Sequence, residues 1–184
     1  MSRHVCRVRS FRAAACLVLL FAAGCGGNKE PQLIAEFPMD DDVELLASGK
    51  GVEFEADRGA DGGGSLHLFV EGEQVFNLYE FEPGPFDGNR LVVKARMRTE
   101  ALYAHAHLDL WLFRPDHEPR WVRTECEALD TTIDWTDIEL AIPLLPDESP
   151  QRIRIAMWMK GIGHLWIDDL RIYADAFRDA AGRE

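Results

Sequence analysis

The stretch His105-Ala106-His107-Leu108-Asp109-Leu110-Trp111-Leu112-Phe113 alternates polar or aromatic side chains with aliphatic ones. Successive side chains of a β-strand point to opposite faces, so this period of two predicts a strand with one aliphatic and one polar, aromatic face. The same period returns in short segments from residue 52 to residue 173, and clusters of Gly, Pro, Asp and Asn separate them. No helical period precedes a short tail after Asp175. The sequence therefore predicts an all-β protein.

Nine or more strands with short connections favour an antiparallel β-sandwich. The expected strands are 52–55, 65–70, 74–79, 91–99, 105–113, 120–124, 135–142, 151–159 and 165–173. Abundant Leu, Ile, Val, Phe and Trp are enough for one hydrophobic core. We therefore expect a single sandwich domain over residues 32–175, with a C-terminal tail over 176–184.

The N-terminus has the composition of an export signal. Four arginines and no acid occupy the first twelve residues, and an apolar or small run of about a dozen residues follows, from Ala13 to Gly24. A permanent membrane span needs roughly 20 apolar residues, so this run is too short to be one. The pattern predicts a signal peptide over residues 1–24.

The leader ends in Leu19-Leu20-Phe21-Ala22-Ala23-Gly24-Cys25, which resembles the lipobox of bacterial lipoproteins. In that family the cysteine is acylated and becomes the new N-terminus, so the resemblance implies lipidation of Cys25 and a tether over 25–31. Ala22 departs from the pattern, which prefers a larger aliphatic residue there. Gly26 is not the Asp that favours inner-membrane retention, so the resemblance implies a lipid-anchored protein of the cell envelope, at the outer membrane. Ordinary signal cleavage, with Cys25 as an incidental thiol, is the alternative.

Charge and cysteine content argue against a nucleic-acid-binding protein and against a fold stabilised by disulfides. The net charge of −12 would become −16 after removal of the leader, because four basic and no acidic residues leave with it. Such an acidic chain is unsuited to nucleic acid as a partner. Cys6 and Cys16 would also leave with the leader and Cys25 would carry lipid, so Cys126 would remain alone and no internal disulfide would form.

Four segments resemble galactose-binding-like jelly rolls, a group that includes several carbohydrate-binding module families. They are 57–68 (DRGADGGGSLHL), 93–100 (VKARMRTE), 135–143 (WTDIELAIP) and 161–172 (GIGHLWIDDLRI). The last is similar to the closing strand of those modules, with its Gly-x-Gly, Trp and paired Asp. The likeness covers nearly the whole mature chain in the expected order and implies a jelly-roll β-sandwich.

Alternation also predicts a polar, aromatic outer face. If the strands 91–99, 105–113 and 151–159 share a sheet, their non-aliphatic side chains line a ligand groove. The candidate ligand-binding residues are Trp111, Trp158, Arg96, Arg98, His107 and Asp109. Tryptophan rings stack on the apolar face of a pyranose, while Arg, His and Asp hydrogen-bond to hydroxyls, so this set suits a sugar. In the alternative, loops cover this face and the tryptophans are ordinary cross-strand aromatics.

The resemblance also implies a structural calcium ion. In many galactose-binding-like modules, calcium ties an early acid and loop carbonyls to an Asp of the last strand. Here Asp168 or Asp169 matches the late Asp, and Glu36 or Asp57 would supply early carboxylates, which suit a hard cation. In the alternative, Asp168 accepts backbone hydrogen bonds and Asp169 is a solvated charge.

Catalytic and zinc-site patterns are weak. No nucleophile elbow, phosphate loop or zinc-protease helix occurs in the sequence. Adjacent acids such as Asp168 and Asp169 point to opposite faces of a strand and would not flank one glycosidic bond. His105, His107 and Asp109 share one strand face, whereas zinc sites usually draw their ligands from more than one element.

We therefore expect no enzyme. The sequence predicts an envelope lipoprotein, held to a membrane by its lipid, whose β-sandwich binds a carbohydrate or another extracellular polymer without catalysis. The alternative is a protein–protein adaptor or accessory lipoprotein of an envelope complex that uses the same fold.

Overall fold

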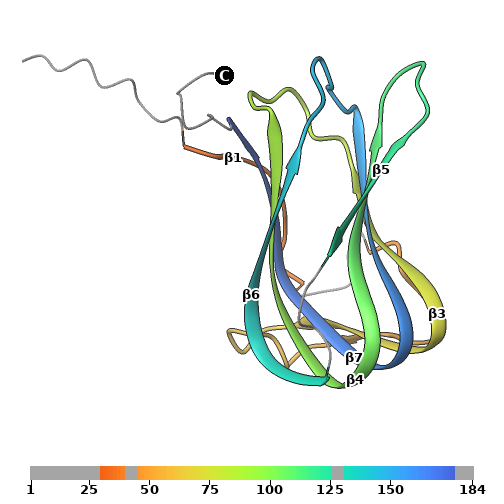
Figure 1. Ribbon diagram of the computed structural model, residues 1–184. Helices are drawn as coiled ribbons and strands as arrows, with labels where there is room; N and C mark the ends of the chain where they lie inside the picture. The colour runs from red at the N-terminus through yellow and green to blue at the C-terminus, as the bar shows by residue number, and fades with distance from the viewer. Residues whose placement is uncertain (1–29, 40–44, 126–130, 177–184) are drawn as a thin grey trace, which may run out of the picture.

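The computed structural model describes residues 30–39, 45–125 and 131–176, and the described residues form seven β-strands and no helix (Figure 1). The strands are β1 (Gln32–Phe37), β2 (Val52–Glu55), β3 (Ser65–Phe81), β4 (Arg90–Phe113), β5 (Arg120–Glu125), β6 (Thr131–Pro143) and β7 (Arg152–Asp175). Every pairing between them is antiparallel. Within the described ranges there is no helix long and apolar enough to cross a membrane.

Three of the strands are bent. β4 and β7 have 24 residues each, and a straight strand of that length would extend roughly 80 Å at about 3.3 Å per residue. Positive φ angles interrupt the extended backbone at Gly72 in β3 (107°), Ala101 in β4 (48°), and Gly161 (137°) and Gly163 (144°) in β7. Figure 1 shows β4 and β7 descending on one side of the molecule, turning at the bottom and rising on the other side.

Each bent strand gives one arm to each of two layers. In the first layer the order is β2, β3, β7, β4 and β6, and β1 extends the β3 side of β7. In the second layer the order is β3, β7, β4 and β5. β7 is central in both, since it pairs with β3 along one edge and with β4 along the other. The fold is the antiparallel jelly-roll β-sandwich that the sequence predicts.

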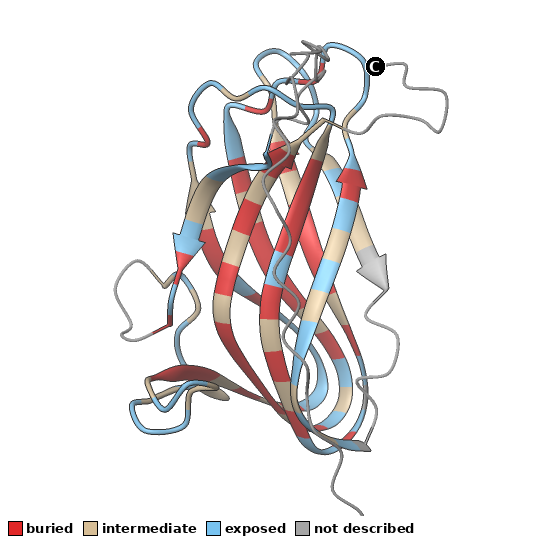
Figure 2. Cartoon of the chain, turned by 90° about the vertical axis from the view of Figure 1, so that its left-hand side faces the viewer, coloured by how far each residue is buried: buried red, intermediate tan, exposed pale blue. Residues whose placement is uncertain are grey.

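The two layers share one hydrophobic core, which appears as alternating buried bands along the strands in Figure 2. In the second arm of β4 the buried apolar positions are Ala106, Leu108, Leu110 and Leu112, as the period of two predicts. The same cluster contains aliphatic and Met residues from the first layer and from the second arm of β3 and the first arm of β7. These include Leu66, Leu68, Leu78, Val93, Met97, Ile153, Ile155, Met157, Leu165 and Ile167. Burial of these side chains between the arms stabilises the folded-over sheet.

The count of strands differs from the sequence-based expectation of nine or more. Three expected pairs are the two arms of a single bent strand. These are 65–70 with 74–79 in β3, 91–99 with 105–113 in β4, and 151–159 with 165–173 in β7. Strand pairing continues on both sides of each bend. The residues that predict a turn at these places therefore bend the strand without ending it. β1 was not among the expected strands.

The bend in β7 requires glycine at position 163. A Cβ there would lie 2.5 Å from the Cα of Leu102 and 2.6 Å from the carbonyl oxygen of Ala101, both in the backbone of β4. The positive φ of Gly163 is also a conformation that residues with a side chain rarely adopt. The close approach of β4 and β7 at the bend therefore depends on the missing side chain.

Candidate functional site

The outer face of the second layer carries three tryptophans from three strands. Pairing of β4 with β7 places His107 opposite Trp158, and pairing of β4 with β5 places Trp111 opposite Trp121. None of these side chains belongs to the core: Trp121 is 47% exposed, and Trp111 and Trp158 are half-buried. We call this surface, with Trp111, Trp121 and Trp158, the tryptophan face.

The rings of the tryptophan face contact one another. The centroids of Trp111 and Trp121 are 6.2 Å apart, and those of His107 and Trp158 are 5.2 Å apart. The interplanar angles are 34° for Trp111 and Trp121 and 35° for His107 and Trp158. Offset and tilted geometries of this kind are favourable for aromatic pairs. The rings therefore form a supported aromatic surface that reaches solvent.

Arg123 of β5 is fixed at the centre of this surface. Its Nε and one terminal nitrogen donate to the two carboxylate oxygens of Asp109, both at 2.9 Å. Its guanidinium carbon lies 4.4 Å from the ring centroid of Trp158 and 4.7 Å from that of Trp121. Hydrogen bonding to Asp109, which is only 3% exposed, raises the pKa of Arg123. A bidentate pair that also stacks on two rings is a preorganised group for polar recognition.

A second ion pair borders Trp158. The indole nitrogen of Trp158 donates to Glu73 Oε1 at 3.3 Å, and Lys160 Nζ lies 3.0 Å from Glu73 Oε2. The hydrogen bond from Lys160 lowers the pKa of Glu73, and the one from Trp158 acts in the same direction. Glu73 therefore remains ionised and holds the indole edge of Trp158.

The far edge of the face is built around Phe113. The guanidinium of Arg152 lies 4.4 Å from the Phe113 centroid, and that of Arg154 lies 5.4 Å away. Glu80 of β3 bridges the two cations, with contacts of 3.3 Å to Arg152 and 2.6 Å to Arg154.

A hollow of about 450 Å³ opens in the loops that follow β3 and precede β7. It is lined by Glu82, Gly84, Pro85, Ser149, Pro150 and Gln151.

The structure brings together four of the six predicted ligand-binding residues, namely Trp111, Trp158, His107 and Asp109. Arg96 and Arg98 lie in the first arm of β4, opposite Asp168 and Trp166 of β7. They are therefore on the outer face of the other layer. Alternation assigns a residue to one side of a strand, but it does not show that the strand later folds back on itself.

Trp121 and Arg123 were missing from the predicted site. Both lie on the outward side of β5, and pairing places them opposite Trp111 and Asp109. The sequence does contain the signal, because the expected strand 120–124 alternates Trp121 and Arg123 with Val122. Alternation within one strand does not show which strand lies beside it. The position of β5 next to β4, at the edge of the second layer, could therefore not be predicted.

The four predicted calcium ligands lie in different surroundings. Glu36 and Asp169 each contact Arg171 at 2.7 Å, so the structure pairs these two carboxylates with the same arginine. Asp57 is exposed. Asp168 is buried and accepts a hydrogen bond from the Ala60 amide at 2.7 Å, beside the glycine-rich loop.

Asp168 is the member of this set that suits calcium best, because it is a carboxylate that does not contact an arginine in the described ion pairs and it lies beside the glycine-rich loop. Burial raises the pKa of Asp168, while backbone hydrogen bonds from Ala60 and Asp169 lower it, and the charges of Asp61 and Asp169 raise it. The register of β4 and β7 shifts between Asp168 and Arg171, and Asp169, whose φ is 53°, lies within this irregularity. Calcium bound through Asp168 stays a prediction.

Two further sequence-based hypotheses concern a metal site on β4 and the cysteines. The three-ligand set His105, His107 and Asp109 is not available as a metal site, because both oxygens of Asp109 bond to Arg123. Cys25, the leader and Cys126 lie outside the described residues.

Solved structures with a similar fold include several xylan-related modules. The CBM22-1 xylan-binding domain of Paenibacillus barcinonensis Xyn10C aligns with a TM-score of 0.55 and 11% identity, over 82% of this chain and 99% of that domain. The CBM22-1–GH10 modules of Clostridium thermocellum xylanase 10B, complexed with xylohexaose, align with a TM-score of 0.57 and 12% identity. That alignment covers 78% of this chain and 28% of the xylanase chain.

A tandem of two CBM22 domains from Paenibacillus barcinonensis Xyn10C aligns with a TM-score of 0.54 and 17% identity, over 78% of this chain and 50% of the tandem. No protein-family model and no curated protein matches the sequence. Identities this low establish shape alone. The chain therefore has the β-sandwich fold found in carbohydrate-binding modules.

Proposed function

We propose that the tryptophan face binds a carbohydrate without catalysis. One observation carries the proposal: three tryptophans from three strands reach solvent on one face, around an Arg123–Asp109 pair that is already held in place. The rings offer apolar surfaces for pyranose C–H groups, and the charged groups offer directional hydrogen bonds to hydroxyls. Fixing these groups before binding lowers the entropy cost of association.

The carboxylates of this face support binding rather than hydrolysis. Glu73 contacts Lys160, Glu80 contacts Arg152 and Arg154, and Asp109 is bonded to Arg123. A glycosidase needs one carboxyl group held protonated as an acid and a second as base or nucleophile. The hydrogen bond from Lys160 lowers the pKa of Glu73, which is the opposite of what a general acid requires. Glu80 and Asp109 are each engaged in ion pairs with arginines, so these described groups suit the orientation of charged donors toward a sugar.

The exposed tryptophans also favour a sugar over a protein partner. An adaptor that uses a flat acidic surface would bury its aromatic residues in the fold, whereas here Trp121 is half exposed. The fold neighbour that binds xylan suggests β-linked polysaccharides as the first ligands to test. A glycan-array screen of the chain from Glu30 onward, which contains all seven strands, would identify the ligand; absence of binding to any glycan would oppose the proposal.

Replacement of two rings tests which face binds. We expect Trp111→Ala combined with Trp158→Ala to weaken binding of the identified glycan at least about tenfold, because stacked rings dominate such interfaces. Tyr103→Ala is the matched control, since Tyr103 is an exposed aromatic at the bend in β4, away from the face. Unchanged affinity in a folded double variant would rule out the tryptophan face.

Lipidation of Cys25 and display at the envelope are part of the same proposal, and they rest on the lipobox-like leader. An acylated N-terminus with several chains would hold the sandwich durably at a membrane. We expect Cys25→Ser to move the protein from the membrane fraction to the soluble fraction of expressing cells. Retention of that variant in the membrane, with no incorporation of labelled fatty acid into the native chain, would contradict the anchor.

A further inference from the structure

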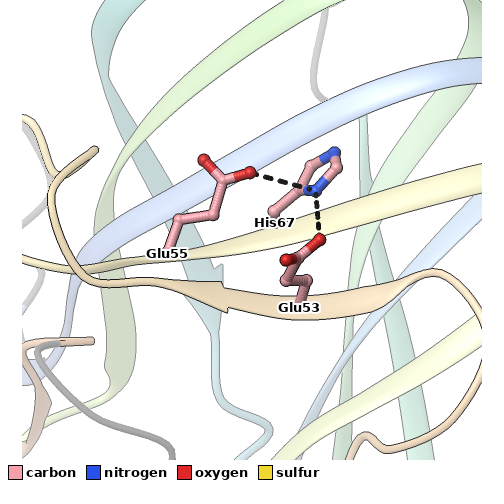
Figure 3. Close-up of side chains that lie close together, drawn as sticks. All are labelled: Glu53, Glu55 and His67. Carbon is pink, nitrogen blue, oxygen red and sulfur yellow. Dashed lines mark ion pairs between the residues drawn. The ribbon is translucent and has the colours of Figure 1, made fainter.

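A second cluster of polar side chains lies on the outer face of the first layer, away from the tryptophan face. Glu53 and Glu55 lie on the same side of β2, two residues apart, and Glu53 is paired with His67 of β3. Figure 3 shows both carboxylates reaching the same edge of the His67 ring. His67 Nδ1 is 3.5 Å from Glu55 Oε1 and 4.0 Å from Glu53 Oε2.

These distances are close to those around a small metal ion. The three ligand atoms all lie within 4.8 Å of one another. Ligands at about 2.0–2.2 Å from a tetrahedral ion lie roughly 3.3–3.6 Å apart. The side chain of Glu53 is 72% exposed, so it is free to close the remaining gap without a change in the core. The cluster therefore needs only a small side-chain movement to surround an ion.

The imidazole of His67 is held in a fixed orientation. Its ring stacks on Trp166, with centroids 4.5 Å apart and an interplanar angle of 13°. Its Nε2 lies 2.9 Å from Nδ1 of His164. Histidines that bind metal usually donate their second ring N–H to a neighbouring acceptor. When His67 donates from Nε2 to His164, the lone pair on Nδ1 points toward the two carboxylates.

Glu55 is oriented by partners on its other oxygen. Its Oε2 accepts a hydrogen bond from the indole of Trp166 at 3.1 Å and lies 3.3 Å from Nε of Arg58. Its Oε1 is left facing His67. Three lone-pair donors, one nitrogen and two oxygens, then converge on one point. Such a convergence is stabilised by a cation and is unfavourable without a proton or a metal between them.

We propose that Glu53, Glu55 and His67 bind a divalent transition-metal ion, with zinc preferred, on the face opposite the tryptophan face. One imidazole and two carboxylates match the ligands that zinc takes in proteins, and the exposed side of the cluster leaves a position for water. Calcium is disfavoured there because it prefers oxygen ligands only. The ion would join β2 to β3 at the edge of the first layer.

The test is zinc binding to the full chain, purified in detergent without a polyhistidine tag and measured by isothermal titration calorimetry. We expect saturable binding of one zinc ion per chain. Glu53→Gln keeps the shape of an exposed residue while removing a charged ligand, and it should weaken binding at least about tenfold, since even residues that only orient ligands cost about 10–100-fold. His67→Gln should weaken it at least as much.

Glu71→Gln is the matched control. Glu71 lies in β3, is exposed like Glu53, and contacts only Lys50 among the ion pairs described. Its zinc affinity should equal that of the native chain. Circular dichroism would show that each variant is folded. The proposal is overturned if the native chain binds no zinc, if Glu53→Gln binds zinc as the native chain does, or if calcium displaces zinc from the site.

Discussion

The two outer faces of the sandwich carry the same kinds of side chain and present them in opposite ways. On the first layer, Trp166 is 3% exposed, its ring contacts His67 and Arg98, and its indole nitrogen is bonded to Glu55. On the second layer, the rings of the tryptophan face reach solvent. Residue type therefore does not show whether a tryptophan is covered by the fold or exposed to solvent. The contacts around each ring show it.

The largest expected effect concerns the bend that puts the two faces on opposite sides. Gly163→Ala should lower the free energy of unfolding by at least about 4 kcal/mol, because it adds backbone strain and overlaps the backbone of β4. Gly72→Ala is the matched change, since Gly72 also has positive φ but open space around it. It should cost only about 1–2 kcal/mol. Equal losses in chemical denaturation would show that close packing of β4 and β7 at the bend is unimportant.

The next effect separates the covered ring from an open one. Trp166→Ala should cost about 3–4 kcal/mol of stability, because it leaves a cavity and removes the donor to Glu55. Trp121→Ala should cost less than about 1 kcal/mol, since much of its ring is already in water. Urea unfolding of both variants measures the difference. A large loss at Trp121 would mean that its ring serves the fold.

Ion pairs provide a third comparison between the faces. Arg123→Ala should cost about 2 kcal/mol, because it leaves the buried carboxylate of Asp109 without its cation. Lys94→Ala on the first layer should change stability by less than about 1 kcal/mol, since the Lys94–Glu139 pair is largely in solvent. Thermal unfolding of the two variants checks the ranking, and an equal effect would place Asp109 in contact with water.

The smallest expected effect is a pH dependence of stability. Burial lowers the pKa of His67 from its ordinary value of 6.5, the charges of His164 and Arg58 act in the same direction, and Glu55 and Glu53 oppose them. The imidazole of His67 therefore binds a proton less readily in the folded protein than in the unfolded chain. Its contribution to the free energy of unfolding is complete above pH 6.5 and is lost as the pH falls through the pKa of the folded protein.

With chelator present, His67→Gln should reduce this loss in denaturant unfolding between about pH 8 and about pH 5. His105→Gln, which changes an exposed histidine of the second layer, should leave the pH dependence as in the native chain. A native chain whose stability is flat across this range would contradict the burial of His67.

Much of the fold was predictable from the period of two. Leu108, Leu110 and Leu112 are fully buried where alternation places them, and Trp111 points outward. The sequence did not predict that β4 continues through Ala101 into the other layer, because a positive φ at alanine has no pattern of its own. For that reason alternation alone groups Arg96 and Arg98 with Trp111, although the bend places them on different faces.

The candidate site was predictable where one strand carries it and less so where strands meet. His107, Asp109 and Trp111 follow from β4 alone. Arg123 enters only through the pairing of β5 with β4, and the Glu53–Glu55–His67 cluster only through the pairing of β2 with β3. Pairing between strands depends on the packing of the whole core, which local alternation does not encode.

The indole N–H signals of the five tryptophans offer the most direct test of the tryptophan face. Two-dimensional NMR would be recorded on the labelled chain before and after addition of the glycan found on the array. The signals of Trp111, Trp121 and Trp158 should shift with a common saturation curve, while that of Trp166, buried on the opposite face, should stay in place. Shifts confined to Trp166, with the other three unmoved at saturation, would contradict carbohydrate binding at this face.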